Sequence, residues 1–170
     1  VQLQLPKRND QFLLVPMTQE QADIHAEFRS DLSRILQKYQ KYHFMSEKDR
    51  KRMMLLLAQM RMVSDSTFIL DQDPKRHYDM KVAEVMNLLN NILDNEEEKV
   101  VIFSEWERMT RLVAKELDSR GIRYEYLHGG VPSKQRGQLV QNFTTLPESR
   151  VFLSTDAGST GLNLQVASTL

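Results

Sequence analysis

The chain has 170 residues, no net formal charge at pH 7, 41% hydrophobic and 27% charged residues, a balance that excludes collagen-like and wholly disordered chains. It has no cysteine, which excludes disulfides, thiolate zinc sites and a cysteine nucleophile. No apolar run reaches the roughly 18 residues that span a bilayer, and no charged-then-apolar leader opens the sequence, so we expect neither a membrane span nor a signal peptide.

The first half of the sequence predicts helices after a short extended segment. Residues 12–15 are apolar and precede a proline, which favours a short strand. Thr18, with Gln21 three residues later, is typical of a capping box at the start of a helix. Apolar side chains at helical spacing predict a second helix over residues 46–63 and a third over residues 79–93.

From about residue 99 the apolar pattern changes from helical spacing to short continuous runs. Residues 100–103 and 151–153 are such runs, which suit strands that are buried on both faces of a sheet, and residues 122–127 are expected to form a further strand between them. Helices are expected between them, one from about Trp106 and one capped by Ser133. Strands that alternate with helices through short loops predict an α/β fold with a parallel sheet and right-handed crossovers.

Ligands of parallel sheets bind at the carboxyl ends of the strands, so the loops that follow the strands are candidate sites. These loops cover residues 104–106, 128–133 and 154–163. In the second loop, Gly129 and Gly130 place backbone amides before a helix, where anions bind, and Arg136 adds a donor for a phosphate. A plain turn before a solvated helix explains the same residues. We expect His128 to position this loop rather than to act in catalysis.

The third loop is the richest in polar and small residues. They are Ser154, Thr155, Asp156, Gly158, Gly161 and Asn163. Hydroxyls and closely approaching backbone amides bind phosphate oxygens, which favours a phosphate or nucleotide contact. An ordinary turn with helix-capping hydroxyls remains an equal alternative. In the first loop, Ser104 is a candidate phosphate contact, and Trp106 is expected to pack against the helix that follows it.

Several segments together carry a resemblance to a known family. They are residues 100–106, which match helicase motif IV, residues 127–130, which match the phosphate-contacting motif after it, and residues 154–168, which match motif V. In this order and spacing they resemble the C-terminal helicase lobe of Swi/Snf-type proteins in helicase superfamily two. The resemblance extends upstream, because residues 5–6 with 17–21 resemble the exit from lobe one, and the helices up to residue 70 resemble the family's helical protrusion.

The resemblance implies a RecA-like parallel sheet flanked by helices, forming an incomplete lobe two, preceded by an α-helical protrusion. It divides the chain into an extended lead-in over residues 1–17, the protrusion over residues 18–78 and the partial second lobe over residues 79–170. It also implies an ATP-dependent DNA translocase, in which two lobes close on ATP with Mg²⁺ and step along one strand of duplex DNA. The partners are then double-stranded DNA and the first RecA-like lobe in cis, with no membrane.

By position, the resemblance also assigns contacts to single residues. Those expected at the DNA backbone are Ser104, His128, Gly129, Gly130, Arg136, Ser154 and Thr155, and those expected at the nucleotide are Asp156, Gly158, Gly161 and Asn163. The location would be the nucleoid of a bacterial or archaeal cytoplasm, or a eukaryotic nucleus. The chain has no Gly-x-x-x-x-Gly-Lys-Ser/Thr loop, Asp-Glu box or final arginine motif, so we expect no catalytic residue in it, Mg²⁺ ligands in lobe one, and no ATP hydrolysis by this chain alone.

Two other functions remain open at this point. Another nucleotide-binding α/β enzyme, such as a transferase, would need a glycine-rich loop after the first strand, and residues 104–107 contain no glycine. A non-catalytic interaction module would bind a protein partner through residues 1–95 without the sheet.

Overall fold

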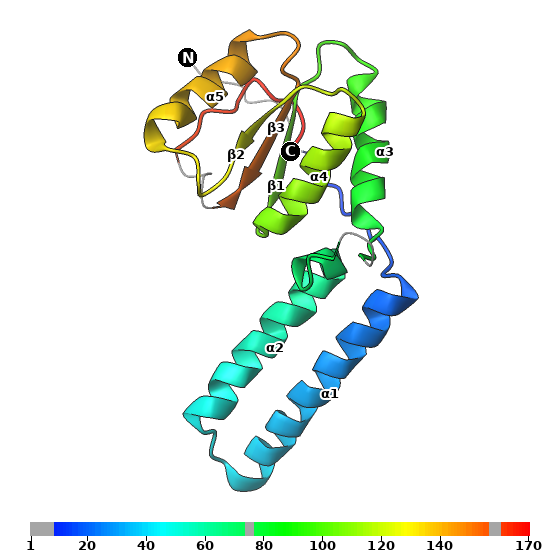
Figure 1. Ribbon diagram of the computed structural model, residues 1–170, viewed down its shortest axis with the longest axis vertical. Helices are drawn as coiled ribbons and strands as arrows, with labels where there is room; N and C mark the ends of the chain where they lie inside the picture. The colour runs from blue at the N-terminus through cyan, green and yellow to red at the C-terminus, as the bar shows by residue number, and fades with distance from the viewer. Residues whose placement is uncertain (1–8, 74–76, 157–160) are drawn as a thin grey trace.

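A computed structural model describes residues 9–73, 77–156 and 161–170, with a helical hairpin at one end and a small α/β part at the other (Figure 1). The hairpin consists of α1 (Gln19–Tyr42) and α2 (Glu47–Asp65), and the short 3-10 helix η1 (Thr67–Ile69) leads out of it. The α/β part follows in the order α3 (Lys81–Leu93), β1 (Val100–Ser104), α4 (Glu107–Ser119), β2 (Tyr124–Leu127), α5 (Ser133–Thr145) and β3 (Val151–Thr155). None of the described helices is both long and apolar enough to cross a membrane.

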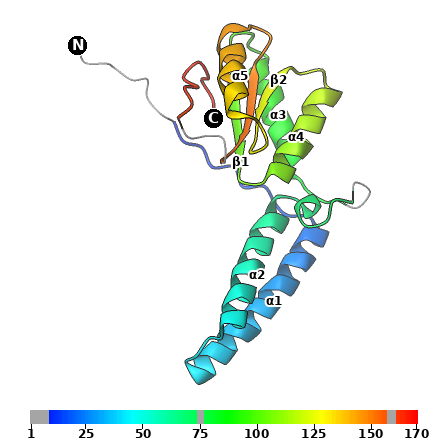
Figure 2. The same cartoon turned by 60° about the vertical axis from the view of Figure 1, so that its left-hand side comes forward.

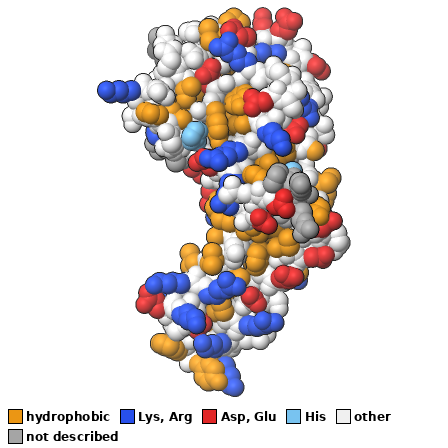
Figure 3. All heavy atoms as spheres, viewed as in Figure 1, with side chains coloured by type: hydrophobic (Ala, Val, Ile, Leu, Met, Phe, Trp, Pro, Cys, Tyr) orange, Lys and Arg blue, Asp and Glu red, His pale blue; other side chains and the backbone are white. Residues whose placement is uncertain are grey.

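Side-chain caps and one buried amide fix the hairpin. The hydroxyl of Thr18 accepts from the Gln21 amide while the Gln21 side chain accepts from the Thr18 amide, so the predicted capping box is confirmed. Gln21 is 1% exposed and donates to the carbonyl of Val63 over 2.7 Å, which ties the start of α1 to the end of α2. Apolar side chains that remain exposed on both helices form the hydrophobic patches along the hairpin in Figure 3.

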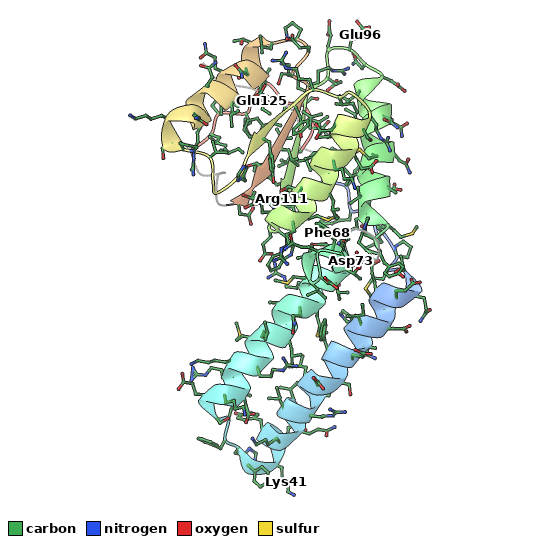
Figure 4. All side chains as sticks on the ribbon, viewed as in Figure 1. Lys41, Phe68, Asp73, Glu96, Arg111 and Glu125 are labelled. Carbon is green, nitrogen blue, oxygen red and sulfur yellow. The ribbon has the colours of Figure 1, made fainter. Side chains whose placement is uncertain are left out.

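Polar contacts join the hairpin to the α/β part. The Ser66 hydroxyl donates to the Asp79 carboxylate over 3.0 Å, and Lys81 forms an ion pair with Asp65 over 2.6 Å. Beneath them lies a cluster of buried residues that we call the junction cluster. It consists of Ile69, Val82, Met109 and Leu112, with Met62, Phe68 and Trp106 packed against it. Figure 4 labels Phe68 at this place, where the end of α2 meets the α/β part.

The sheet has the strand order β1-β3-β2 with both pairs parallel, which confirms the predicted class. The chain passes from β1 across β3 to β2 and then returns to the centre. Right-handed crossovers in opposite directions therefore place α4 and α5 on opposite faces, as Figure 1 and Figure 2 show. Side chains of alternate strand positions fill the two cores, so Leu153 packs with α3 and α4, and Phe152 packs with Phe143 of α5.

Residues 12–15 do not form the predicted strand. Phe12 and Leu14 are 93% and 96% exposed, and no neighbouring strand pairs with them among the described residues. An isolated apolar run cannot form a strand, because a strand needs a partner for its backbone groups. The predicted cap by Ser133 is also wrong. Pro132 takes the cap position with φ −58° and ψ 140°, so Ser133 is already the first helical residue, and its hydroxyl caps nothing.

The second strand begins later than predicted, at Tyr124, because the preceding residues complete the end of α4. Gly121 has φ 66° and donates its amide to Asp118, while the Ile122 amide donates to Leu117. This pair of bonds is a Schellman motif, which satisfies carbonyls that the helix end leaves unpaired. The helices also differ slightly from prediction, since α2 continues to Asp65 and α3 begins at Lys81.

Candidate nucleic-acid interface at the carboxyl edge of the sheet

The three predicted loops leave the sheet at one edge. Ser104 is in register with Thr155, and Leu127 is in register with Ser154, so the strands end level with one another. Figure 4 shows which edge this is: Glu96, in the turn before β1, lies far from the hairpin, whereas Arg111, early in α4, lies near it. The carboxyl edge, which we call the rim, therefore faces the helical hairpin.

The first loop is a tight turn into α4. The Ser104 hydroxyl accepts from the Trp106 amide over 3.3 Å, and Ser104 is half-buried. Trp106 has an extended backbone at the N-cap of α4, and its ring packs against the junction cluster, as expected from the sequence. The Ser104 hydroxyl keeps its proton free to donate, so a phosphate contact is compatible with this turn.

The second loop is held by its own side chains. His128 Nδ1 accepts from the Gly130 amide over 3.2 Å, which places the proton of the neutral ring on Nε2. The ring of His128 lies 4.8 Å from that of Tyr126, centroid to centroid. Arg136 Nε donates to the Val131 carbonyl over 3.2 Å, which leaves its other guanidinium donors available. His128 thus positions the loop, as predicted, while Gly129 and Gly130 are exposed.

The third loop differs from expectation in the exposure of its first residues. Ser154 is fully buried and Thr155 is 4% exposed, so their hydroxyls are enclosed rather than presented at the rim. The Ser154 hydroxyl instead donates to the Thr155 carbonyl over 3.1 Å. Asp156 is exposed, and Gly158 lies outside the described residues.

From Gly161 to Leu164, at the end of the third loop, residues alternate between solvent and the core. Leu162 and Leu164 pack against the core on the α5 face, while Gly161 and Asn163 are exposed. Gly161 has φ 82°, a conformation that favours glycine over every other residue. The Asn163 carboxamide accepts from the Gln165 amide over 3.3 Å, which holds its side chain beside the backbone. The Asn163 carboxamide and the open backbone at Gly161 are therefore both exposed and accessible to a ligand.

Charged residues that the sequence analysis did not select complete the rim. Glu107, in the first turn of α4, accepts from Arg111 over 2.6 Å, and this bond raises the pKa of the Arg111 guanidinium. The same carboxylate lies 3.8 Å from His128 Nδ1, so it connects the first loop with the second. The four-residue spacing of Glu107 and Arg111 within a helix predicts their ion pair from the sequence. The proximity of Glu107 to His128 could not be predicted, because it depends on how β2 and α4 pack in the fold.

A parallel sheet with helices on both faces, polar loops gathered at one rim and a helical hairpin before it defines an incomplete RecA-like lobe. Residues 80–170 match the family described as the helicase conserved C-terminal domain. This match covers more than half of the chain, so the protein belongs to that family. The alternative of an unrelated nucleotide-binding enzyme is thereby removed.

Comparisons with individual proteins support the same lobe. The chain is 30% identical over 129 residues to the chromodomain-helicase-DNA-binding protein 1-like of Danio rerio, covering 71% of this chain and 13% of that protein. It is 34% identical over 91 residues to the DNA repair and recombination protein RDH54 of Saccharomyces cerevisiae, covering 53% of this chain and 10% of that protein. The chain thus spans about a tenth of the length of these relatives.

Solved structures show the same fold. The C-terminal domain of the Sulfolobus solfataricus SWI2/SNF2 ATPase superposes with a TM-score of 0.73 at 21% identity, covering 89% of this chain and 65% of that one. The core of that ATPase in complex with dsDNA superposes with a TM-score of 0.68 at 19% identity, covering 89% of this chain and 31% of that one. The predicted resemblance to the C-terminal lobe of Swi/Snf-type helicases is confirmed.

Proposed function

We propose that this chain supplies the lobe-two contacts of an ATP-dependent DNA translocase of the Swi/Snf type, acting with a first RecA-like lobe in cis. The observation that carries the proposal is the convergence of three polar loops on one rim, fixed by the register of Ser104, Leu127 and Ser154 with their neighbours. Two comparisons support duplex DNA as the ligand. The name of the Danio rerio relative includes DNA binding, and the Sulfolobus solfataricus ATPase core, which has a similar fold, was solved in complex with dsDNA.

The DNA backbone would lie along the exposed part of the rim. Ser104, His128 and Arg136 supply side-chain donors, and Gly129 and Gly130 allow a phosphate to approach the backbone closely. Gly130 already gives its amide to His128, so its role is close approach rather than donation. The resemblance also assigns Ser154 and Thr155 to DNA, and we propose that, being enclosed, they form the floor beneath the contact.

ATP with Mg²⁺ would lie against the other part of the rim, between the two lobes. Asp156, Gly161 and Asn163 are exposed there, and together with Gly158 they form the proposed nucleotide contact. The chemistry of this set suits nucleotide binding, because carboxamides and open backbone amides bind phosphate and ribose oxygens. The Mg²⁺ ligands belong to the first lobe in this proposal. We propose that the chain divides into the extended lead-in (1–17), the protrusion (18–78) and the partial lobe (79–170), and that the protein acts at DNA in a nucleoid or nucleus.

A salt series of duplex binding by residues 1–170 tests the DNA contact. We expect weak binding whose affinity falls steeply with salt, because phosphate contacts release counterions. Lys134, exposed in the first turn of α5 beside the second loop, is a suitable probe. Lys134→Gln should reduce the slope of log affinity against log salt by about 0.9 for each phosphate that its ammonium group no longer neutralises. Lys115→Gln, at an exposed position in the third turn of α4, is the matched control and should change nothing.

An equal effect of the two substitutions would refute a DNA contact at the rim. The enzymatic part of the proposal has its own test: residues 1–170 should not hydrolyse ATP, whereas the chain joined to its first lobe should do so faster with DNA. Turnover by residues 1–170 that survives repurification would overturn this part.

A further inference from the structure

One arginine of the hairpin contacts two residues of the first rim loop, Glu105 and Trp106. The Arg61 guanidinium, near the end of α2, forms an ion pair with the Glu105 carboxylate. Its Cζ atom also lies 5.9 Å from the centroid of the Trp106 ring, which is a cation–π arrangement. Glu105 and Trp106 are the only residues between the last residue of β1 and the first of α4. The Arg61 side chain therefore contacts both residues of the connection between β1 and α4.

Two further contacts connect the start of α4 to the residues that follow α2. Arg108, in the first turn of α4, donates to the carbonyl of Ile69 at the end of η1. The Trp106 ring itself packs against the junction cluster, which includes residues of η1, α3 and α4. Figure 2 shows the end of α2 directly beneath the start of α4. The conformation of the first loop therefore depends on how the hairpin is seated.

The first loop is in turn connected to the second. Glu107 follows Trp106 and lies 3.8 Å from His128 Nδ1. A change in the path of residues 105–107 would thus move the side chain next to the histidine that braces the second loop. The contacts run from the hairpin through the first loop to the second, along the rim.

We propose that Arg61 is a positioning residue for DNA binding, which sets the geometry of the rim loops from the hairpin without itself contacting DNA. This inference rests on the proposed function of the rim. The competing explanation is that Arg61 binds a phosphate directly, since its side chain is 65% exposed. The two explanations make opposite predictions for its partner. Removing the Glu105 carboxylate should weaken DNA binding if Arg61 positions the loop, and should strengthen it if Arg61 is a phosphate ligand held back by Glu105.

The first measurement needs no DNA. Trp106 is the only tryptophan of the chain, so tryptophan emission, excited at a wavelength that its five tyrosines do not absorb, reports on the first loop. Arg61→Ala should shift the emission to longer wavelength and increase quenching by acrylamide, while thermal melting stays cooperative. Arg61→Lys, which keeps the charge but loses the planar group, should give an intermediate change. Arg34→Ala, which breaks an exposed ion pair with Asp31 elsewhere in the hairpin, should leave the emission unchanged. Unchanged emission in Arg61→Ala would overturn the inference.

The second measurement is a double-mutant cycle of duplex affinity in residues 1–170. Arg61→Ala and Glu105→Ala should each weaken binding about fivefold, the equivalent of one weak contact, with the salt slope unchanged. The double variant should be no weaker than either single one, because both remove the same contact. Stronger binding by Glu105→Ala, additive effects or a smaller salt slope in Arg61→Ala would refute positioning. If the unaltered chain binds no DNA, the proposed function fails instead, and the fluorescence result still decides whether Arg61 orders the loop.

Discussion

Lys99, the residue before β1, holds the end of α5 through its ammonium group. Its Nζ atom donates to the carbonyl of Phe143 and, over 2.9 Å, to that of Leu146, and it lies 5.3 Å from the centroid of the Phe143 ring. The last carbonyls of a helix have no partner within the helix, and a cation at this end is favourable. Lys99 is 9% exposed, and burial lowers the pKa of its ammonium group, so its charge carries a desolvation cost.

Replacing Lys99 by Met keeps most of the stem and removes both donors. Hydrogen bonds from a charged donor contribute at least about 1.5 kcal/mol each, so two bonds set the gross loss at about 3 kcal/mol. The substitution also removes the free-energy cost of burying the ammonium charge, which offsets part of this loss. We therefore expect Lys99→Met to lower the free energy of unfolding by about 2 kcal/mol. The assay is urea denaturation at pH 7, with the condition that the slope against denaturant is unchanged.

Lys115→Met, at an exposed position in α4, is the control for removing a lysine charge. Its unfolding free energy should change by no more than about 0.5 kcal/mol. If Lys99→Met is as stable as this control, or more stable than the unaltered protein, the ammonium group does not cap α5, and the reasoning fails.

Two further predictions concern alkaline pH and the second loop. Burial raises the pKa of Tyr124 from 10.0 to about 12, so the phenol proton dissociates from the unfolded chain at a lower pH than from the folded one. The free energy of unfolding should therefore fall as pH rises from 10 to about 12. In alkaline denaturation, Tyr124→Phe should lose less of its unfolding free energy across that window. A Cβ at Gly130 would lie 3.0 Å from His128 Cε1, so Gly130→Ala should displace the ring and weaken DNA binding with little change in melting temperature. Gly137→Ala, at an open position in α5, should raise stability by up to about 1 kcal/mol and leave affinity unchanged; equal affinities of the two alanine variants would contradict the role of this loop.

The elements that were predicted correctly have local causes. The capping box at Thr18 needs only residues three apart, and the buried strands follow from continuous apolar runs, whatever lies next to them. The order of strands and helices then dictates that all the loops share one edge. The prediction was wrong where the structure depends on a pairing partner. Residues 12–15 have the composition of a strand, but no described strand lies beside them to pair with their backbone groups.

The parts of the site that were not predicted depend on packing between distant residues. The sequence predicts Ser154 and Thr155 as exposed hydroxyls of a loop. They are instead the last two residues of β3, the central strand of the sheet, and neighbouring residues cover them. The contact of Arg61 with Glu105 joins residues 44 positions apart on different elements, so no periodicity in the sequence points to it. Loops can thus be placed from the sequence, but the exposure of each side chain in them cannot.

The central claim is that the rim binds duplex DNA, and amide chemical-shift mapping of residues 1–170 tests it most directly. Titration with a short duplex at low salt should perturb amides at Ser104, Gly129, Gly130 and the residues after Gly161, on three loops far apart in the sequence. The turn around Glu96, at the opposite edge of the sheet, should stay unperturbed. Perturbations confined to that turn or to the helical hairpin, with the rim amides unmoved, would contradict the account.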